Sequence, residues 1–134
     1  MKDDLLNAAR DAMKKAYAPY SDFSVGASIR GSKGEIYSGC NVENAAYPQG
    51  CCAEASAISA MVMAGEQQIA EVCVIGNGDA LVTPCGGCRQ RIREFGNDDT
   101  PIHVCGPEGL RKTITLGELL PLSFGPDNLS KKEV

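Results

Sequence analysis

Two short segments of the chain carry side chains that could bind a catalytic metal ion. Cys52-Ala53-Glu54 supplies one thiol, and Pro84-Cys85-Gly86-Gly87-Cys88 supplies two more. Three thiols can occupy three corners of a tetrahedron around Zn²⁺ and leave the fourth open for water, which distinguishes a catalytic zinc site from a structural one. Glu54 lies two residues beyond the first thiol, so it can approach the open corner without filling it and act as the catalytic acid/base group. One zinc ion per chain is expected, and its predicted ligands are Cys52, Cys85 and Cys88.

Other chemistries of these residue types fit the sequence less well. A redox Cys-x-x-Cys motif needs a thioredoxin-like context, which Pro84 and the two glycines do not supply. A structural zinc ribbon needs a second Cys-x-x-Cys, and the adjacent Cys51 and Cys52 have the wrong spacing. A non-enzymatic zinc module would fill the fourth ligand position, for which no residue is evident. The single histidine, His103, lies in a strand-like run, so nucleophile schemes that need a histidine are nearly excluded.

The remaining cysteines are expected to be structural. Cys51 could compete with Cys52 for the metal, but only Cys52 gives the Cys-x-Glu spacing. Cys73 and Cys105 lie in apolar strand-like runs, where cysteine behaves as a small buried side chain. Cys40 is interpreted in the same way. His103 is likewise expected to be a satisfied core or sheet-face residue without a ligand role.

Length and composition are typical of an ordinary globular protein. The 134 residues predict a single domain over residues 1–134, with a loose polar tail over about 127–134. The net charge of −4 disfavours a nucleic-acid partner, because binding phosphates requires a basic surface. No signal peptide or membrane span is expected, so no membrane partner is either. An odd number of cysteines, seven, without an export signal favours a reducing cytoplasm over a disulfide scaffold.

The hydrophobic pattern predicts helices that alternate with strands. Helices are expected over residues 3–17, 52–64 and 88–95, and the capping box Thr115-Leu116-Gly117-Glu118 predicts a short fourth one. Strands are expected over residues 23–30, 35–38, 72–75, 102–105 and 112–115. This alternation implies a mixed sheet sandwiched between helices. The zinc thiols would then lie at the beginnings of two helices, whose positive N-termini favour thiolates.

Six segments occur in a characteristic order along almost the whole chain. They are Tyr17-Ala18-Pro19-Tyr20-Ser21, Phe23-Ser24-Val25-Gly26-Ala27, Asn41-Val42-Glu43-Asn44-Ala45-Ala46-Tyr47, Cys52-Ala53-Glu54, Pro84-Cys85-Gly86-Gly87-Cys88-Arg89-Gln90 and Leu119-Leu120-Pro121-Leu122-Ser123-Phe124. Together they resemble the small homotetrameric cytidine deaminases that bind zinc through three cysteines. The resemblance implies an α/β fold, a three-layer α-β-α sandwich with a mixed five-stranded sheet. It also implies zinc-dependent hydrolytic deamination of cytidine and 2′-deoxycytidine to uridine and 2′-deoxyuridine, with release of ammonia, in pyrimidine salvage.

The resemblance also implies which residues hold the nucleoside. Asn41 and Glu43 would hydrogen-bond the ribose hydroxyl, and Phe23 would line the pocket. Ala53 would lie against the substrate beside the zinc site. Phe124 would stack on the base from a neighbouring subunit, so each active site of the homotetramer would be composite.

The chain departs from the family pattern at one position. The family sequence Cys-Ala-Glu-Arg-Thr is replaced by Cys52-Ala53-Glu54-Ala55-Ser56. In the family that arginine hydrogen-bonds the zinc thiolates and offsets their charge, which Ala55 cannot do. Arg89, one residue past Cys88, is the nearest cation in sequence to a zinc ligand. We therefore expect Arg89 to support the zinc centre through a hydrogen bond to a thiolate.

Two related deaminase activities are alternatives. The first is a deaminase of another small aminopyrimidine, such as a blasticidin-type nucleoside antibiotic. Asn41-Val42-Glu43-Asn44 argues against it, because Glu43 suits a ribose hydroxyl. The second is a polynucleotide deaminase, which the acidic composition and the lack of basic extensions oppose.

Overall fold

A computed structural model of the chain describes residues 1–129, which form one five-stranded sheet in the order β2-β1-β3-β4-β5. The strands are β1 (Val25–Gly31), β2 (Ile36–Cys40), β3 (Ile69–Gly76), β4 (Pro101–Gly106) and β5 (Gly109–Thr115). The helices are α1 (Asp3–Met13), α2 (Ala53–Met63), α3 (Gly86–Phe95) and α4 (Leu116–Leu119), with 3₁₀ turns η1 (Tyr47–Gln49) and η2 (Pro126–Leu129). Residues 127–129 of the predicted tail thus belong to η2, and residues 130–134 lie outside the described residues.

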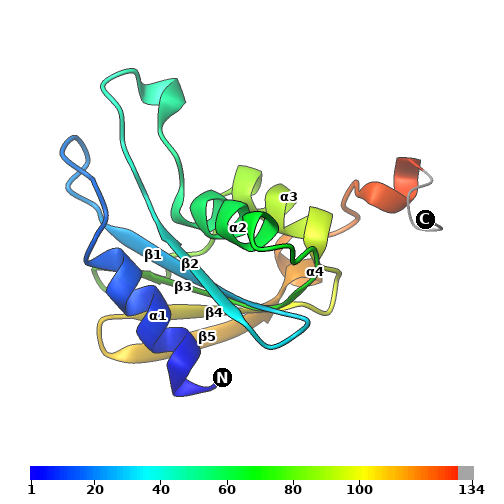
Figure 1. The fold of residues 1–134 in the computed structure, drawn as a ribbon. Coiled ribbons are helices and arrows are strands. Elements are labelled where there is room, and N and C mark those ends of the chain that lie inside the picture. The colour runs from blue at the N-terminus through cyan, green and yellow to red at the C-terminus, as the bar shows by residue number, and fades with distance from the viewer. Residues whose placement is uncertain (130–134) are drawn as a thin grey trace.

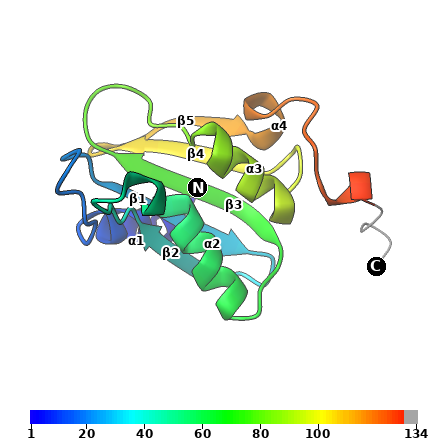
Figure 2. The ribbon, with the colours of Figure 1, turned by 90° about the horizontal axis from the view of Figure 1, so that it is seen from above.

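The helices cover the two faces of the sheet. Figure 1 shows α1 on one face and α2 with α3 on the other, and Figure 2 shows α2 and α3 side by side across the strands. Alternate residues of β3 divide between the two layers. Val72 and Val74 belong to the core beneath α2 and α3, whereas Cys73 and Ile75 pack against α1. The predicted α-β-α sandwich with a mixed five-stranded sheet is confirmed. No helix within residues 1–129 is long and apolar enough to cross a membrane.

The topology places the N-termini of α2 and α3 at the same edge of the sheet. β2 and β3 are each antiparallel to β1, which lies between them, and β3 is parallel to β4. The three strands β2, β3 and β4 therefore run in one direction. α2 connects β2 to β3, and α3 connects β3 to β4, so both helices begin beyond the carboxyl ends of their preceding strands. Ligands bind at this edge in open α/β sheets.

Two glycines allow helices to lie unusually close to the sheet. A Cβ atom at Gly26 would come within 2.0 Å of the carbonyl oxygen of Ala9 in α1. A Cβ atom at Gly39 would come within 2.5 Å of the backbone nitrogen of Ala57 in α2. Because real Cβ atoms do not tolerate such distances, these glycines set how closely each helix packs. Gly39 thereby sets the distance between the sheet and α2, the helix that begins beside Cys52.

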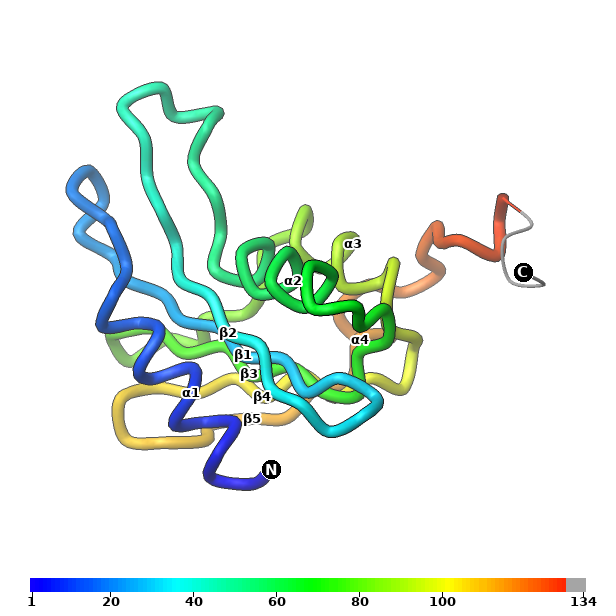
Figure 3. Tube along the Cα trace, viewed as in Figure 1, coloured from blue at the N-terminus to red at the C-terminus, as the bar shows by residue number. Residues whose placement is uncertain are grey.

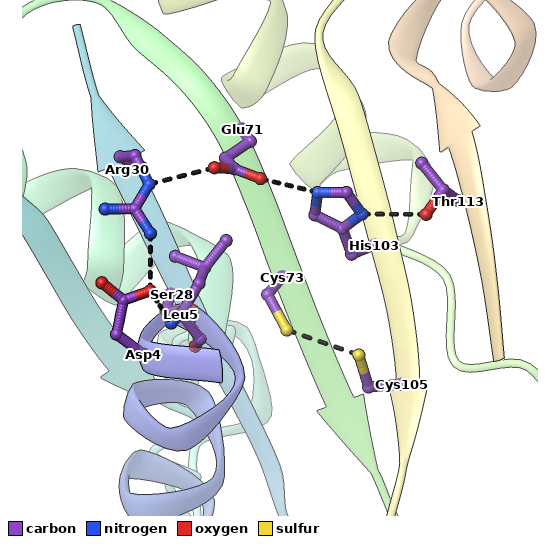
Figure 4. Close-up of polar contacts among 9 residues, drawn as sticks. All are labelled: Asp4, Leu5, Ser28, Arg30, Glu71, Cys73, His103, Cys105 and Thr113. Carbon is purple, nitrogen blue, oxygen red and sulfur yellow. Dashed lines mark hydrogen bonds and ion pairs between the residues drawn. The ribbon is translucent and has the colours of Figure 1, made fainter. Parts of the chain in front are cut away.

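A chain of polar contacts crosses the α1 face of the sheet (Figure 4). Arg30 bridges Asp4 of α1 and Glu71 of β3, with N···O distances of 2.7 and 3.0 Å. Glu71 also contacts His103 Nε2 at 2.7 Å, and Nδ1 of that ring lies 2.9 Å from Thr113 Oγ1. Burial raises the pKa of Glu71, but hydrogen bonds from His103 and Arg30 outweigh it and leave the pKa below its ordinary value. His103 is therefore a satisfied sheet-face residue, as predicted.

The other structural cysteines lie beside this network. Cys73 and Cys105 are fully buried on neighbouring strands, with their sulfurs 3.5 Å apart (Figure 4). This confirms that both behave as small core side chains. Cys40 ends β2 and is half-buried.

Element boundaries differ from the prediction mainly where distant segments pair. The predicted helix over residues 3–17 ends instead at Met13. Tyr17 cannot continue it, because its backbone N–H donates to Asn41 and its carbonyl accepts from Glu43. The predicted strand from Phe23 begins at Val25, whose N–H donates to the Asn41 side chain. The capping box at Thr115 is confirmed, with the Thr115 and Glu118 side chains each bonding the other's backbone.

We expect Gly39→Ala to destabilise the fold by about 1–3 kcal/mol, the usual cost of overpacking a tight contact. The added methyl group would have to displace α2 from β2. Urea denaturation measures the effect. Ser38→Ala is the matched control, because Ser38 is exposed on the same strand and should shift stability by less than about 0.5 kcal/mol. Equal stability of the two variants would show that the close contact between Gly39 and α2 does not restrict the side chain at position 39.

Candidate metal centre and active site

Three cysteine sulfurs converge where α2 and α3 begin. Cys52 is the N-cap residue of α2, Cys85 is the N-cap residue of α3, and Cys88 lies in the first turn of α3. Their Sγ atoms all lie within 4.8 Å of one another, and within residues 1–129 the cluster includes no fourth His, Cys, Asp or Glu. Zn–S bonds of about 2.3 Å place tetrahedral sulfurs about 3.8 Å apart. The donor set therefore fits a zinc ion with one open position.

The surroundings of the three thiols differ. Cys88 is buried, whereas Cys52 and Cys85 retain exposed surface. Burial raises the pKa of the Cys88 and Cys52 thiols. Backbone N–H groups of Cys88 and Gly87 lower the pKa of Cys85, as expected at a helix N-terminus. Because zinc binds thiolates, the ion would have to overcome the cost of ionising Cys52 and Cys88, whose pKa values are raised.

Glu54 lies in the first turn of α2 with only 5% of its surface exposed. Burial raises the pKa of its carboxyl group. Its own backbone N–H, the charge of Arg91 and the Cys88 thiol oppose this rise without cancelling it. A carboxyl group beside the sulfur cluster whose pKa is raised in this way holds a proton more readily than an exposed glutamate does.

The structure separates Cys51 from Cys52. The backbone of Cys51 pairs with Val42 through hydrogen bonds of 2.8 and 2.9 Å, and its Sγ receives a weak bond from Ser56 Oγ. The sulfur cluster contains Cys52 and not Cys51. This agrees with the choice of Cys52 over Cys51 that the Cys-x-Glu spacing predicted.

Two loops stand side by side at the end of the sheet that carries the sulfurs (Figure 3). One connects α1 to β1, the other connects β2 to α2, and they pair through Tyr17 and Val42. Glu43 accepts hydrogen bonds from the N–H groups of Tyr20 and Ser21 and from the Ser21 hydroxyl, which hold the pKa of its carboxyl below its usual value. A cavity of about 360 Å³ lies between the loops, lined by Tyr20, Ser21, Glu43, Asn44, Tyr47 and Gly50.

The other predicted substrate residues occupy different surroundings. Asn41 accepts from Val25 and donates to the Phe23 carbonyl, each at 2.9 Å, so it orders the start of β1. Phe23 is 39% exposed, and its ring lies beside Gly76 at the carboxyl end of β3. Ala53 is the first residue of α2 and is buried in the core between that helix and the sheet. Phe124 is 58% exposed and belongs to the segment after α4 that leaves the body of the molecule (Figure 1).

The predicted hydrogen bond from Arg89 to a thiolate is replaced by a different arrangement. Its guanidinium donates to the carbonyl oxygens of Pro84 and Leu119 and to Thr83 Oγ1, so Arg89 braces the loop before Cys85. The guanidinium that reaches a cluster sulfur is that of Arg91. Sequence adjacency missed it, because neighbouring residues of a helix face different directions, whereas residues three apart share a face.

Comparison with known proteins agrees with this geometry. Residues 1–104 match the family model described as the cytidine and deoxycytidylate deaminase zinc-binding region. The chain is 38% identical over 128 residues to a cytidine deaminase of Sporosarcina psychrophila, covering 96% of this chain and 94% of that protein. It is 40% identical over 126 residues to the cytidine deaminase of Mycobacterium tuberculosis, covering 92% and 90%. The chain belongs to the cytidine deaminase family. It is a hydrolytic deaminase by class, as the sequence motifs predicted.

The fold comparison leads to the same family. The crystal structure of cytidine deaminase from Burkholderia pseudomallei superposes with a TM-score of 0.87 at 37% identity, over 92% of this chain and 99% of that one. Both the family and the fold predicted from the cytidine deaminase motifs are confirmed.

We expect Cys52→Ala to weaken zinc binding by more than about 100-fold, because losing a ligand should cost more than the 10- to 100-fold typical of an outer-shell change. Metal analysis after dialysis against a competing chelator measures the loss. Cys51→Ala is the matched control, since it removes the adjacent sulfur that lies outside the cluster. Zinc retained in Cys52→Ala and lost in Cys51→Ala would reverse the assignment.

Proposed function

We propose that this enzyme deaminates cytidine and 2′-deoxycytidine to uridine and 2′-deoxyuridine, in pyrimidine salvage. The observation that supports this most directly is the convergence of three sulfurs with one buried carboxyl group at the beginnings of two helices. Cys52, Cys85 and Cys88 would hold one zinc ion per chain. The single domain, its seven free cysteines and the family's nucleoside chemistry suit the cytoplasm.

Glu54 carries the proton transfers in this proposal. Zinc held by Cys52, Cys85 and Cys88 would supply a Lewis acid that lowers the pKa of a bound water toward neutrality. Glu54 accepts a proton from the attacking water and delivers it to N3 of the cytosine ring, then takes the proton of the new hydroxyl at C4 and passes it to the departing amino group. The C4–N bond breaks, ammonia leaves, and the water oxygen becomes O4 of the uracil ring. Burial suits Glu54 to this work, because a raised pKa lets the carboxyl group exchange protons at each step.

The loops beside the site support a nucleoside substrate. Glu43 is held ionised at the wall of the cavity, where its oxygens can accept a hydrogen bond from a ribose hydroxyl. Asn41 orders the Phe23–Val25 segment and would share the ribose contact. Phe23 would form an apolar wall for the base, whereas the Ala53 side chain packs into the core beside Glu54. A ribose-binding carboxylate disfavours both a substrate without ribose and a polyanionic nucleic acid.

The absorbance change on mixing purified enzyme with cytidine, 2′-deoxycytidine, cytosine and single-stranded DNA tests this substrate assignment. Conversion of the two nucleosides without the free base or the DNA would support the proposal. Turnover of DNA, or of neither nucleoside, would contradict it.

Glu54→Gln should lower kcat by about 10⁴-fold or more, because one group serves several proton transfers and each typically contributes 10²- to 10⁴-fold. The amide keeps the shape of the carboxyl group, so zinc content should remain at the wild-type value. Steady-state kinetics together with metal analysis checks both expectations. Near-normal turnover in this variant would contradict the role of Glu54.

We also propose a homotetramer with composite active sites, as the resemblance to small three-cysteine cytidine deaminases implies. The segment after α4 carries apolar side chains that a single chain leaves in solvent: Leu122, Phe124 and Leu129. Exposed apolar surface of this kind marks protein interfaces. Phe124 would stack on the base in a site whose zinc ligands belong to another subunit.

Phe124→Ala should raise KM with little change in zinc content, because Phe124 would contact the base and not the metal. Co-expression with Glu54→Gln tests the composite arrangement. Each variant alone should be impaired, but hybrid tetramers contain sites with Glu54 from one chain and Phe124 from the other, and these should regain wild-type KM. Hybrids without any recovery, or fully active monomers in ultracentrifugation, would contradict the composite site.

A further inference from the structure

Helix α3 carries three arginines, and the described contacts separate their roles. Arg89 donates to Pro84, Leu119 and Thr83 around the loop before the helix. Arg93 donates to Ser123 and forms an ion pair with Asp127 on the segment after α4. Arg91 directs its Nη1 atom to Cys88 Sγ at 3.7 Å. Within residues 1–129, Arg91 is therefore the cation whose guanidinium hydrogen-bonds a cluster sulfur.

The helix itself directs Arg91 toward the cluster. Side chains of an α-helix lean toward its N-terminus, so a residue three positions after Cys88 can reach back onto that sulfur. The guanidinium passes over Gly87, where a Cβ atom would lie only 3.2 Å from Arg91 Nη1. Gly87 thus leaves room for the guanidinium beside the Cys88 thiol.

The charge of the centre gives this contact a function. Three thiolates carry one more negative charge than Zn²⁺ neutralises, and Cys88 is the sulfur that lies buried from solvent. Ala55, beside Glu54, brings no charge to the site. A guanidinium on a thiolate favours the ionised, metal-loaded state and reduces the electron donation of the sulfur, which keeps the metal a stronger Lewis acid.

We propose that Arg91 is a positioning residue of the zinc centre, which balances the charge of the thiolates through Cys88 without touching the substrate. The inference rests on the proposed zinc site and assigns to Arg91 a contribution that the sequence analysis expected from Arg89. On this proposal the positive charge at position 91 is essential. An uncharged side chain of similar length could fill the same space but could not favour the zinc-bound thiolates.

Two substitutions separate charge from packing. Arg91→Gln removes the charge, and Arg91→Lys keeps it. Arg10→Gln is the matched control, because it removes the same charge from α1 on the opposite face of the sheet. Competition with a chromophoric chelator gives the zinc affinity of each variant. The sulfur-to-metal charge-transfer band of the Co²⁺-substituted proteins reports electron donation by the thiolates, which global stability does not alter.

Arg91→Gln should bind zinc about 10- to 100-fold more weakly than the wild type, the usual size of such outer contacts, and its cobalt band should move to lower energy. Arg91→Lys should retain most of the affinity, and Arg10→Gln should match the wild type in both measurements. Zinc affinity and cobalt spectrum unchanged in Arg91→Gln would overturn the inference while leaving the zinc site intact. A wild-type protein that takes up no zinc would instead overturn the proposed function, and this inference with it.

Discussion

The central constraint in this protein is that sulfurs from two separate helices must meet at one point. The order of the strands in the sheet brings these sulfurs together. With β1 inserted between β2 and β3, the strands that precede α2 and α3 run in the same direction, so both helices begin at the same edge. Cys52 and Cys85 are the N-cap residues of these helices, and Cys88 follows one turn into α3. Backbone N–H groups and helix dipoles at both N-termini then favour the negative charge that zinc ligation requires.

Small residues make the convergence possible. α2 can approach the sheet closely because Gly39 has no side chain at the contact, and it buries Ala53 and Ala57 in the core. Close packing of rigid elements holds a site more firmly than loops can, which suits a centre where small displacements of a ligand matter. The loops of the site are tied down differently. Glu43 bonds to the backbone of Tyr20 and Ser21 and so fixes one wall of the cavity, while Asn41 bonds to the backbone of Phe23 and Val25 at the start of β1.

The polar groups around the cluster serve distinct purposes because their surroundings differ. Glu54 is buried and has a raised pKa, whereas N–H and hydroxyl donors keep the pKa of Glu43 below its usual value. Arg89 and Arg91 are both on α3, yet one braces a loop and the other faces a sulfur. On the far side of the sheet, Arg30, Glu71 and His103 join α1 to three strands and leave the only histidine without a metal role.

The sequence by itself identified the three sulfurs that converge, because zinc chemistry restricts both residue type and short-range spacing. Cys52-x-Glu54 and Cys85-x-x-Cys88 are local patterns, and so is the capping box at Thr115. Only the tertiary structure decided what depends on contacts between distant segments. The first helix does not extend to Tyr17 as predicted, because Tyr17 pairs with residues 41–43, some twenty-five positions later. Arg91 rather than Arg89 faces the sulfur because side-chain direction in a folded helix, and not adjacency along the chain, selects which cation reaches Cys88.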